Sequence, residues 1–146
     1  MSTIENIESL LQELELHYIV ADNAIDLRWK TEHFEDLRIR IVTNEKVSWL
    51  YIIARFTSFL EVESSLQLDF AIEMLKASWL YNGIKFAISP DNDVVVFSQT
   101  NDTDLTSPEL STLINNVVHG ADVLWEIANS VGKTNRNTDS KNDESS

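Results

Sequence analysis

The three histidines are the residues best suited to bind a metal ion or to move a proton, but their spacing does not predict such a site. His17, His33 and His119 fall in a predicted connector, a predicted loop and a predicted helix. None has a second histidine four residues away or a nearby third ligand, which is the spacing of a helical zinc site. We therefore expect no metal ion at any of them.

Other reactive arrangements are also missing from the sequence. The pairs Asp91/Asp93 and Asp102/Asp104 resemble calcium-loop pairs, but the glycine and the distal glutamate of such a loop are absent. The chain has no cysteine and only three glycines, so no thiolate site and no glycine-rich phosphate loop is predicted. No serine sits in a nucleophile elbow. We expect no enzyme and no cofactor, although a pair of carboxylates brought together by folding stays open.

Basic and aromatic residues on predicted strands favour a binding function instead. If the apolar residues of each strand face inward, one outward face collects Asp26 and a candidate partner-binding set. That set is Arg28, Lys30, Arg38, Arg40, Trp49, Tyr51, Arg55 and Lys85. Arg, Trp and Tyr are enriched where interfaces concentrate their binding energy. Two interpretations stay open: a client-binding face, or a solvated face whose cations balance neighbouring glutamates. A bulge that shifted the register by one residue would exchange the two faces.

Five strands must position these side chains. Residues 25–30 and 37–42 alternate apolar and polar, whereas residues 47–56, VSWLYIIARF, are apolar on both faces and predict a central strand. Residues 84–88 and 94–98 add two more strands, joined by a turn with proline at its second position. Short polar connections between consecutive strands predict antiparallel pairing.

Three helices are predicted around this sheet. The first begins at Ser2 or Thr3 and fades near Leu16, and residues 17–23 follow it as a connector with Tyr18 and Val20 packed inward. The second covers residues 66–81 and is capped by Ser64 or Ser65.

The third helix is capped by Ser107, with Pro108 in its first turn and a capping box from Thr106 to Glu109. The order α-β-β-β-α-β-β-α predicts an α+β domain with a five-stranded antiparallel sheet over residues 1–131. Residues 132–146 contain no apolar side chain and predict a disordered polar tail.

The second helix is apolar around much of its circumference, so it has more than one surface to bury. Either both surfaces belong to the core, or one of them forms a homodimer contact. The candidate dimer contacts are Phe70, Met74, Trp79 and Tyr81.

The second half of the chain resembles the YbjN family and the wider fold of type III secretion chaperones. The residues that carry the resemblance, between about 65 and 128, are Asn82, Lys85, Phe86, Asp91, Val94, Val95, Val96, Leu105, Glu109, Leu110, Ala121 and Asp122. The first half matches only in the order of its elements. The resemblance implies a small, often dimeric, non-enzymatic domain that holds a segment of another protein. It implies no catalytic residue and no particular client.

The charge and hydropathy of the chain exclude some classes of binding partner. The net charge is −13, with 24 acidic against 11 basic residues, which argues against nucleic acid and anionic membranes. No run approaches the roughly 20 apolar residues of a membrane helix, and the acidic N-terminus does not resemble a signal peptide. We therefore expect a cytoplasmic chaperone or adaptor that binds an extended or acidic client segment, for example during assembly of a larger complex. Two alternatives stay open: a small-ligand or enzymatic domain with an acid-based site, and a subunit whose exposed apolar surface serves only assembly.

Overall fold

The structure is a computed structural model that describes residues 3–44, 49–101 and 104–145, with side chains for 4–44, 49–101 and 104–132. It has the predicted α+β class, but its antiparallel sheet has six strands instead of five. The elements in chain order are α1 (Thr3–Glu13), β1 (Ile19–Ala21), β2 (Ala24–Trp29), β3 (Leu37–Asn44), β4 (Trp49–Ser58), α2 (Gln67–Leu80), β5 (Lys85–Ile88), β6 (Asp93–Thr100) and α3 (Ser107–Ser145). Two short 3₁₀ turns, Phe59–Glu61 and Ser64–Leu66, link β4 to α2.

The additional strand is β1, which lies in the stretch predicted to be a connector. It pairs with β2 through a two-residue turn, Asp22–Asn23, between the partners Ala21 and Ala24. Both turn residues have positive φ, 50° and 62°, as the favoured tight hairpin turns require. The predicted inward packing of Val20 is wrong, because Val20 is 44% exposed on this edge strand.

The sheet order is β1-β2-β3-β4-β6-β5, so the predicted central strand is indeed internal, as β4. The start predicted for it at residues 47–48, and the turn at 45–46, lie outside the described residues. The predicted alternation is confirmed: the inner face buries Ile25, Leu27, Leu37, Ile39, Ile41, Leu50, Ile52, Ala54, Val94 and Val96. A fully buried face of this kind supplies most of the hydrophobic free energy of folding.

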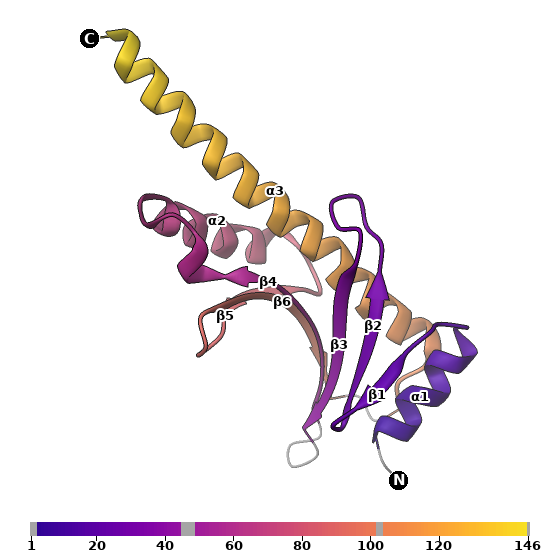
Figure 1. Ribbon diagram of the computed structural model, residues 1–146. Helices are drawn as coiled ribbons and strands as arrows, with labels where there is room; N and C mark the ends of the chain where they lie inside the picture. Colours follow the sequence, from indigo (N-terminus) through magenta and orange to yellow (C-terminus); the bar gives the residue numbers. More distant parts are fainter. Residues whose placement is uncertain (1–2, 45–48, 102–103, 146) are drawn as a thin grey trace.

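All three helices contribute to the core on this inner face, and α3 runs diagonally along it (Figure 1). Gly120 allows α3 to approach the sheet closely, because a Cβ atom there would lie 2.5 Å from Val96 Cγ2. No helix in the described part of the chain has the length and apolarity needed to cross a membrane.

The helix ends differ from prediction by a few residues. Ser64 and Ser65 lie in a 3₁₀ turn, and the residue before α2, Leu66, makes no side-chain cap, so the predicted serine cap is wrong. At α3 the hydroxyl of Thr106 accepts a hydrogen bond from the Glu109 N–H at 3.4 Å, which makes Thr106 the capping residue in place of Ser107. The bounds of α3 include residues 133–145, and the disorder expected of this tail stays a prediction.

Candidate functional site

The outer face of the sheet carries the candidate partner-binding set, and no described helix packs on it (Figure 1). Strand register aligns six positions in one row across this face: Ile19, Asp26, Arg40, Ile53, Phe97 and Lys85. Cross-strand neighbours in such a row are close enough to interact. The row therefore places the charged pair Asp26–Arg40 and the charged Lys85 on either side of two apolar residues, and the exposed Ile19 ends it on β1.

A bulge in β4 leaves this face in the predicted register. The pairing with β6 shifts between Arg55 and Thr57, which inserts Phe56 as an extra residue. Trp49, Tyr51, Ile53 and Arg55 precede the bulge and so keep their common face. Phe56 turns toward the core, where its ring lies 6.5 Å from that of Phe70.

Asp26 lies between two of the predicted arginines. Its carboxylate accepts hydrogen bonds from Arg38 Nη2 at 2.8 Å and from Arg40 Nε at 3.0 Å. The hydrogen bonds from Arg40 and Arg38 lower the pKa of Asp26 from 3.8 to about 2, and the bond to Asp26 raises the pKa of Arg40. The carboxylate is therefore held charged in the range where proteins work.

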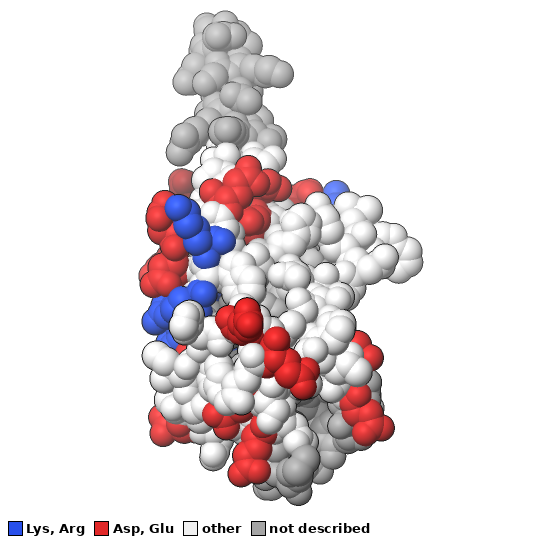
Figure 2. Space-filling model, turned by 90° about the vertical axis from the view of Figure 1, so that its right-hand side faces the viewer, with Lys and Arg blue, Asp and Glu red and all other residues white. Residues whose placement is uncertain are grey.

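The other two arginines of the face also have aspartate partners. Arg55 Nε donates to Asp93 at 2.8 Å, and Arg28 Nη1 lies 3.4 Å from the Asp36 carboxylate. Figure 2 shows most of the Lys and Arg side chains visible in that view gathered at its left side, with Asp and Glu next to them. The four arginines thus have neighbouring acids as partners, as one of the two interpretations expects, but these acids are three aspartates instead of glutamates.

A hollow of about 480 Å³ lies beside the start of β3 and the bulge of β4, where outward-facing residues of the sheet meet inward-facing ones. Its lining combines three arginines with apolar side chains: Arg38, Arg40 and Arg55 with Phe34, Leu37, Ile53 and Phe56, and also Asp36. Guanidinium groups next to aromatic and aliphatic surface can bind a carboxylate and an apolar side chain together. The structure therefore brings Arg38, Arg40 and Arg55 into one site.

The remaining members of the predicted set lie outside this hollow. The rings of Trp49 and Tyr51 stack with centroids 6.5 Å apart. They lie on the same face, at the N-terminal end of β4. Lys85 lies on the edge strand β5 opposite Phe97. Lys30 follows the end of β2 and lines a separate hollow of about 290 Å³ that also includes Arg28. Sequence reasoning missed Val95 and Phe97, which the register of β6 places on the same face.

A second exposed surface lies on α2. Here Trp79 is 89% exposed, and Leu68, Leu75 and Leu80 are each more than 70% exposed. Phe70 and Met74 are buried in the core of the single chain, so their assignment as dimer contacts is corrected. Of the four candidate dimer residues, Trp79 and Tyr81 are the exposed ones.

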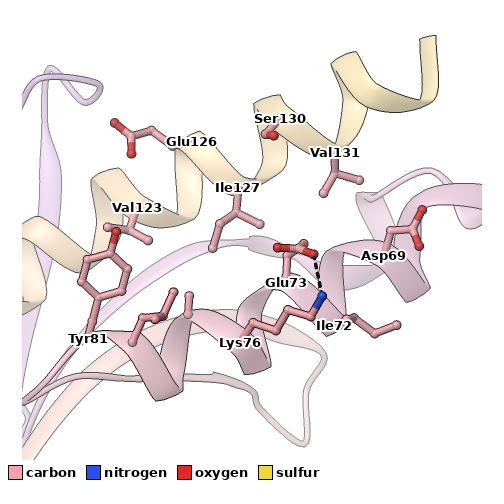
Figure 3. Close-up of a pocket in the computed structure, with 12 residues that line it drawn as sticks. Asp69, Ile72, Glu73, Lys76, Tyr81, Val123, Glu126, Ile127, Ser130 and Val131 are labelled. Atoms are coloured by element: carbon pink, nitrogen blue, oxygen red, sulfur yellow. Dashed lines mark ion pairs between the residues drawn. The ribbon is translucent and has the colours of Figure 1, made fainter. Parts of the chain in front are cut away.

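A groove of about 980 Å³ separates α2 from α3 (Figure 3). Its apolar lining comes from both helices: Ile72, Ala77, Leu80 and Tyr81 on the α2 side, and Val123, Ile127 and Val131 on α3. Glu73 and Lys76 form an ion pair of 3.6 Å within it. The groove thus extends the apolar surface of α2 toward α3.

The structure also brings together three potential metal ligands that the sequence did not indicate. Glu32, His33 and Glu126 have ligand atoms that all lie within 4.8 Å of one another, and no other such group of three exists among the described residues. Glu126 is far away along the chain, so residue spacing could not have paired it with His33.

Comparison with known proteins identifies the fold. No protein-family model and no curated protein sequence matches this chain. Among solved structures, YbjN from E. coli has 13% identity and a TM-score of 0.62, over 91% of this chain and 94% of that one. A chain of the ExoU–SpcU complex from the type III secretion system of Pseudomonas aeruginosa has 16% identity and a TM-score of 0.61, over 83% and 96%.

The Yersinia pestis type III secretion chaperone SycH, solved in complex with a fragment of YscM2, has 19% identity and a TM-score of 0.54, over 82% and 97%. Identities this low bear on architecture alone. The likeness nevertheless covers most of every chain compared, so the fold expected from the sequence resemblance is confirmed. This chain has the fold shared by YbjN and the type III secretion chaperones.

Proposed function

We propose that this protein is a non-enzymatic, chaperone-like module that holds a segment of a client protein on the outer face of its sheet. The observation that carries the proposal is the hollow lined by Arg38, Arg40 and Arg55 together with apolar side chains, of which Phe34, Ile53 and Phe56 are half-buried. Solved structures with this fold include a secretion chaperone bound to a fragment of another protein. The client can belong to a larger assembly, although no residue identifies it.

Charge supports an acidic or extended client segment. Four arginines face three aspartates, which leaves one positive charge on this part of the face in a chain of net charge −13. A client carboxylate that enters the hollow would meet guanidinium groups already oriented by their aspartates. Preorganised donors lose less entropy on binding than free side chains do.

The test is a pull-down from the native cytoplasm followed by binding measurements with the purified partner. The face variant is Ile53→Glu/Arg55→Glu, which places two carboxylates in the hollow without breaking the Asp26 pairs. The matched control is Asn115→Glu on exposed α3 surface. We expect a partner that binds the wild type and the control but not the face variant, with all three proteins folded by circular dichroism. Equal binding by all three would make the sheet-face proposal wrong.

We further propose that a second copy of the chain covers the exposed side of α2. Exposing a cluster of leucines and a tryptophan to water is unfavourable. Burying this apolar area in a symmetric contact between two copies would therefore stabilise a dimer. Sedimentation should give twice the monomer mass of 16.7 kDa for the wild type and for Asn115→Glu. Leu75→Glu/Trp79→Glu should sediment as a monomer. A monomeric wild type would contradict the dimer and leave the client proposal intact.

A small-ligand domain remains the second candidate, because the groove between α2 and α3 is large enough for a ligand of ordinary size. The shifted pKa of Asp26 does not favour acid catalysis on the sheet face. Its pKa is lowered, whereas a general acid needs a raised pKa. Binding of a small molecule in this groove, unaffected by Ile53→Glu/Arg55→Glu, would support this candidate over the client proposal.

A further inference from the structure

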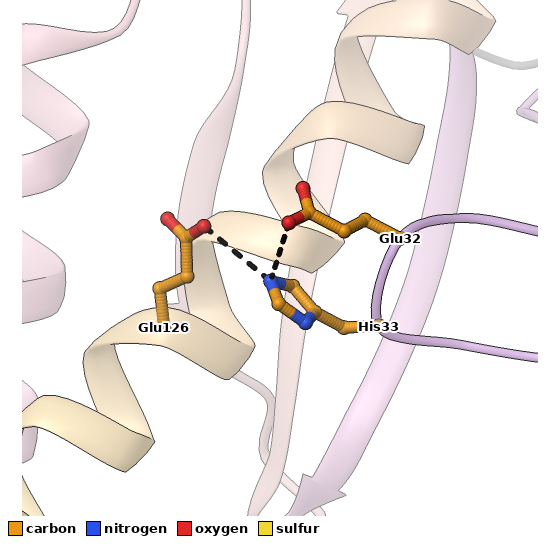
Figure 4. A group of neighbouring side chains, drawn as sticks. All are labelled: Glu32, His33 and Glu126. Atoms are coloured by element: carbon orange, nitrogen blue, oxygen red, sulfur yellow. Dashed lines mark hydrogen bonds and ion pairs between the residues drawn. The ribbon is translucent and has the colours of Figure 1, made fainter.

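Glu32, His33 and Glu126 meet where the loop between β2 and β3 crosses α3 (Figure 4). His33 Nε2 lies 3.4 Å from Glu126 Oε1 and 4.0 Å from Glu32 Oε1. Both carboxylates therefore approach the same ring nitrogen, from two different elements of the fold.

The imidazole of His33 is fixed in place before any ligand binds. Its ring stacks on that of Trp125 with centroids 3.9 Å apart and planes 7° apart, and only 16% of its side chain is exposed. The loop is tied to α3 by Asp122, whose Oδ1 accepts hydrogen bonds from Thr31 Oγ1 at 2.8 Å and from the His33 N–H at 3.2 Å. A further pair of hydrogen bonds between Thr31 and Phe34 closes the loop on itself. The direction of Nε2 is thus set by packing and by hydrogen bonds.

A single hydrogen bond accounts for only part of this arrangement. His33 Nε2 and Glu126 Oε1 are within hydrogen-bond distance at 3.4 Å. The ring nitrogen carries at most one N–H, which donates best along one direction, so the approach of the Glu32 carboxylate to the same atom at 4.0 Å is not explained by that bond. Ligand atoms bound to one tetrahedral zinc ion at about 2.0–2.2 Å are separated by about 3.4 Å. The His33–Glu126 distance already has this value. The Glu32 side chain is 76% exposed and can move the small remaining distance.

We propose that Glu32, His33 and Glu126 form a site for a divalent transition-metal ion of the zinc type. Imidazole together with carboxylates suits zinc and its neighbours, while calcium prefers six to eight oxygen ligands and magnesium an octahedron of oxygens. Three protein ligands leave a fourth position for water. The negative charge of the chain, −13, also raises the local concentration of cations.

The bound ion would link the β2–β3 loop to α3. These two segments are otherwise joined by the Asp122 hydrogen bonds and the His33–Trp125 stack. Because the unfolded chain does not hold the three ligands together, binding would stabilise the folded state. The site shares no residue with the hollow of the sheet face or the exposed side of α2, so its failure would leave both proposals unaffected; Glu126 also lines the groove between α2 and α3.

The test is calorimetric titration of the full chain, freed of metal by a chelator, with zinc chloride, and a thermal melt with and without zinc. The site variants are His33→Gln and Glu126→Gln, and the controls are His17→Gln and Glu35→Gln, which change exposed residues of the same types. Cobalt chloride serves as a second probe, because bound cobalt gives a visible absorption spectrum that reports its ligands.

We expect one zinc ion per wild-type chain, with a higher melting temperature in its presence. Loss of an outer-shell partner typically weakens metal affinity about 10–100-fold, and loss of a ligand should cost at least as much. Both controls should bind like the wild type. Glu126 is 57% exposed, so Glu126→Gln tests the site even if His33→Gln fails to fold. Absence of binding to the wild type, unchanged binding in both site variants, or equal loss in the controls would overturn the proposal.

Discussion

The outer face of the sheet and the exposed side of α2 are both open to solvent, but they are built in opposite ways. On the sheet face, Arg28, Arg38, Arg40 and Arg55 each have an aspartate partner. On α2, Leu75 and Trp79 are more than 70% exposed. Paired charges are tolerated in water at little free-energy cost, whereas clustered apolar side chains are not. Under the two proposals made above, the sheet face would select a partner by its charges and α2 would bury apolar area against one.

The largest change in stability should distinguish the buried side of α2 from its exposed side. Phe70→Ala removes a fully buried ring and should lower the free energy of unfolding by about 3–5 kcal/mol. Trp79→Ala changes a residue that is 89% exposed and should cost about 0.5 kcal/mol or less in the monomer. Urea denaturation measures both values.

Protein concentration sharpens this comparison. In a dimer, Trp79→Ala should destabilise more as the protein concentration rises, because association contributes to the measured stability. Phe70→Ala should show its large effect at every concentration. If Trp79→Ala is as harmful as Phe70→Ala in dilute solution, then the exposure described for α2 is wrong.

Alternation of apolar and polar residues in the sequence was enough to predict which side chains of the sheet are buried. Ile25, Leu27 and Ile39 follow a period of two, and the pleat of a strand converts that period directly into one buried face. The same rule placed Arg38 and Arg40 outward. Their partner Asp26 also follows from alternation, but Asp93 becomes a partner of Arg55 only through the register of β6.

What the sequence could not supply depends on long-range contacts and on unusual backbone conformations. The strand β1 was missed because its turn uses Asp22 and Asn23 at positive φ without a glycine. On α2, helical periodicity could not decide which apolar side chains face the core, since nearly every face is apolar. His33 and Glu126 are 93 residues apart, so only folding brings them together.

The next largest effect should come from Asp26, which joins Arg38 and Arg40 on the sheet face. Asp26→Asn should lower the free energy of unfolding at neutral pH by about 1–2 kcal/mol, after allowance for solvent around the arginines. Asp36→Asn, in an exposed pair with Arg28, should cost about 0.5 kcal/mol or less and serves as the control. Urea denaturation at a series of pH values measures both.

The sign of the pH dependence follows from the pKa of Asp26, which is about 2 in the folded chain against an ordinary 3.8. A lowered pKa means that the folded state favours the charged carboxylate. The stability it contributes is fully present above about pH 5 and is lost as the pH falls through about 4 to 2. The difference between wild type and Asp26→Asn should therefore shrink over that range. A difference that stays constant down to pH 2 would contradict the ion-pair origin.

The smallest stability effect should come from Arg55, and it bears most directly on function. Arg55 donates to Asp93 at 2.8 Å, but its side chain is 57% exposed, so Arg55→Gln should change the free energy of unfolding by about 0.5 kcal/mol or less. Added salt should remove even that difference, since exposed charges are screened over about 10 Å at 0.1 M. Arg55 also lines the hollow of the sheet face, so the client proposal predicts that its main effect is on binding. Client affinity, measured by calorimetry with the purified partner, should fall about 30-fold or more in Arg55→Gln, since truncating a paired charge at an interface costs about 2–5 kcal/mol. Arg28→Gln, outside the hollow, should leave that affinity unchanged; equal losses in both variants would indicate general attraction by positive charge in place of a specific site.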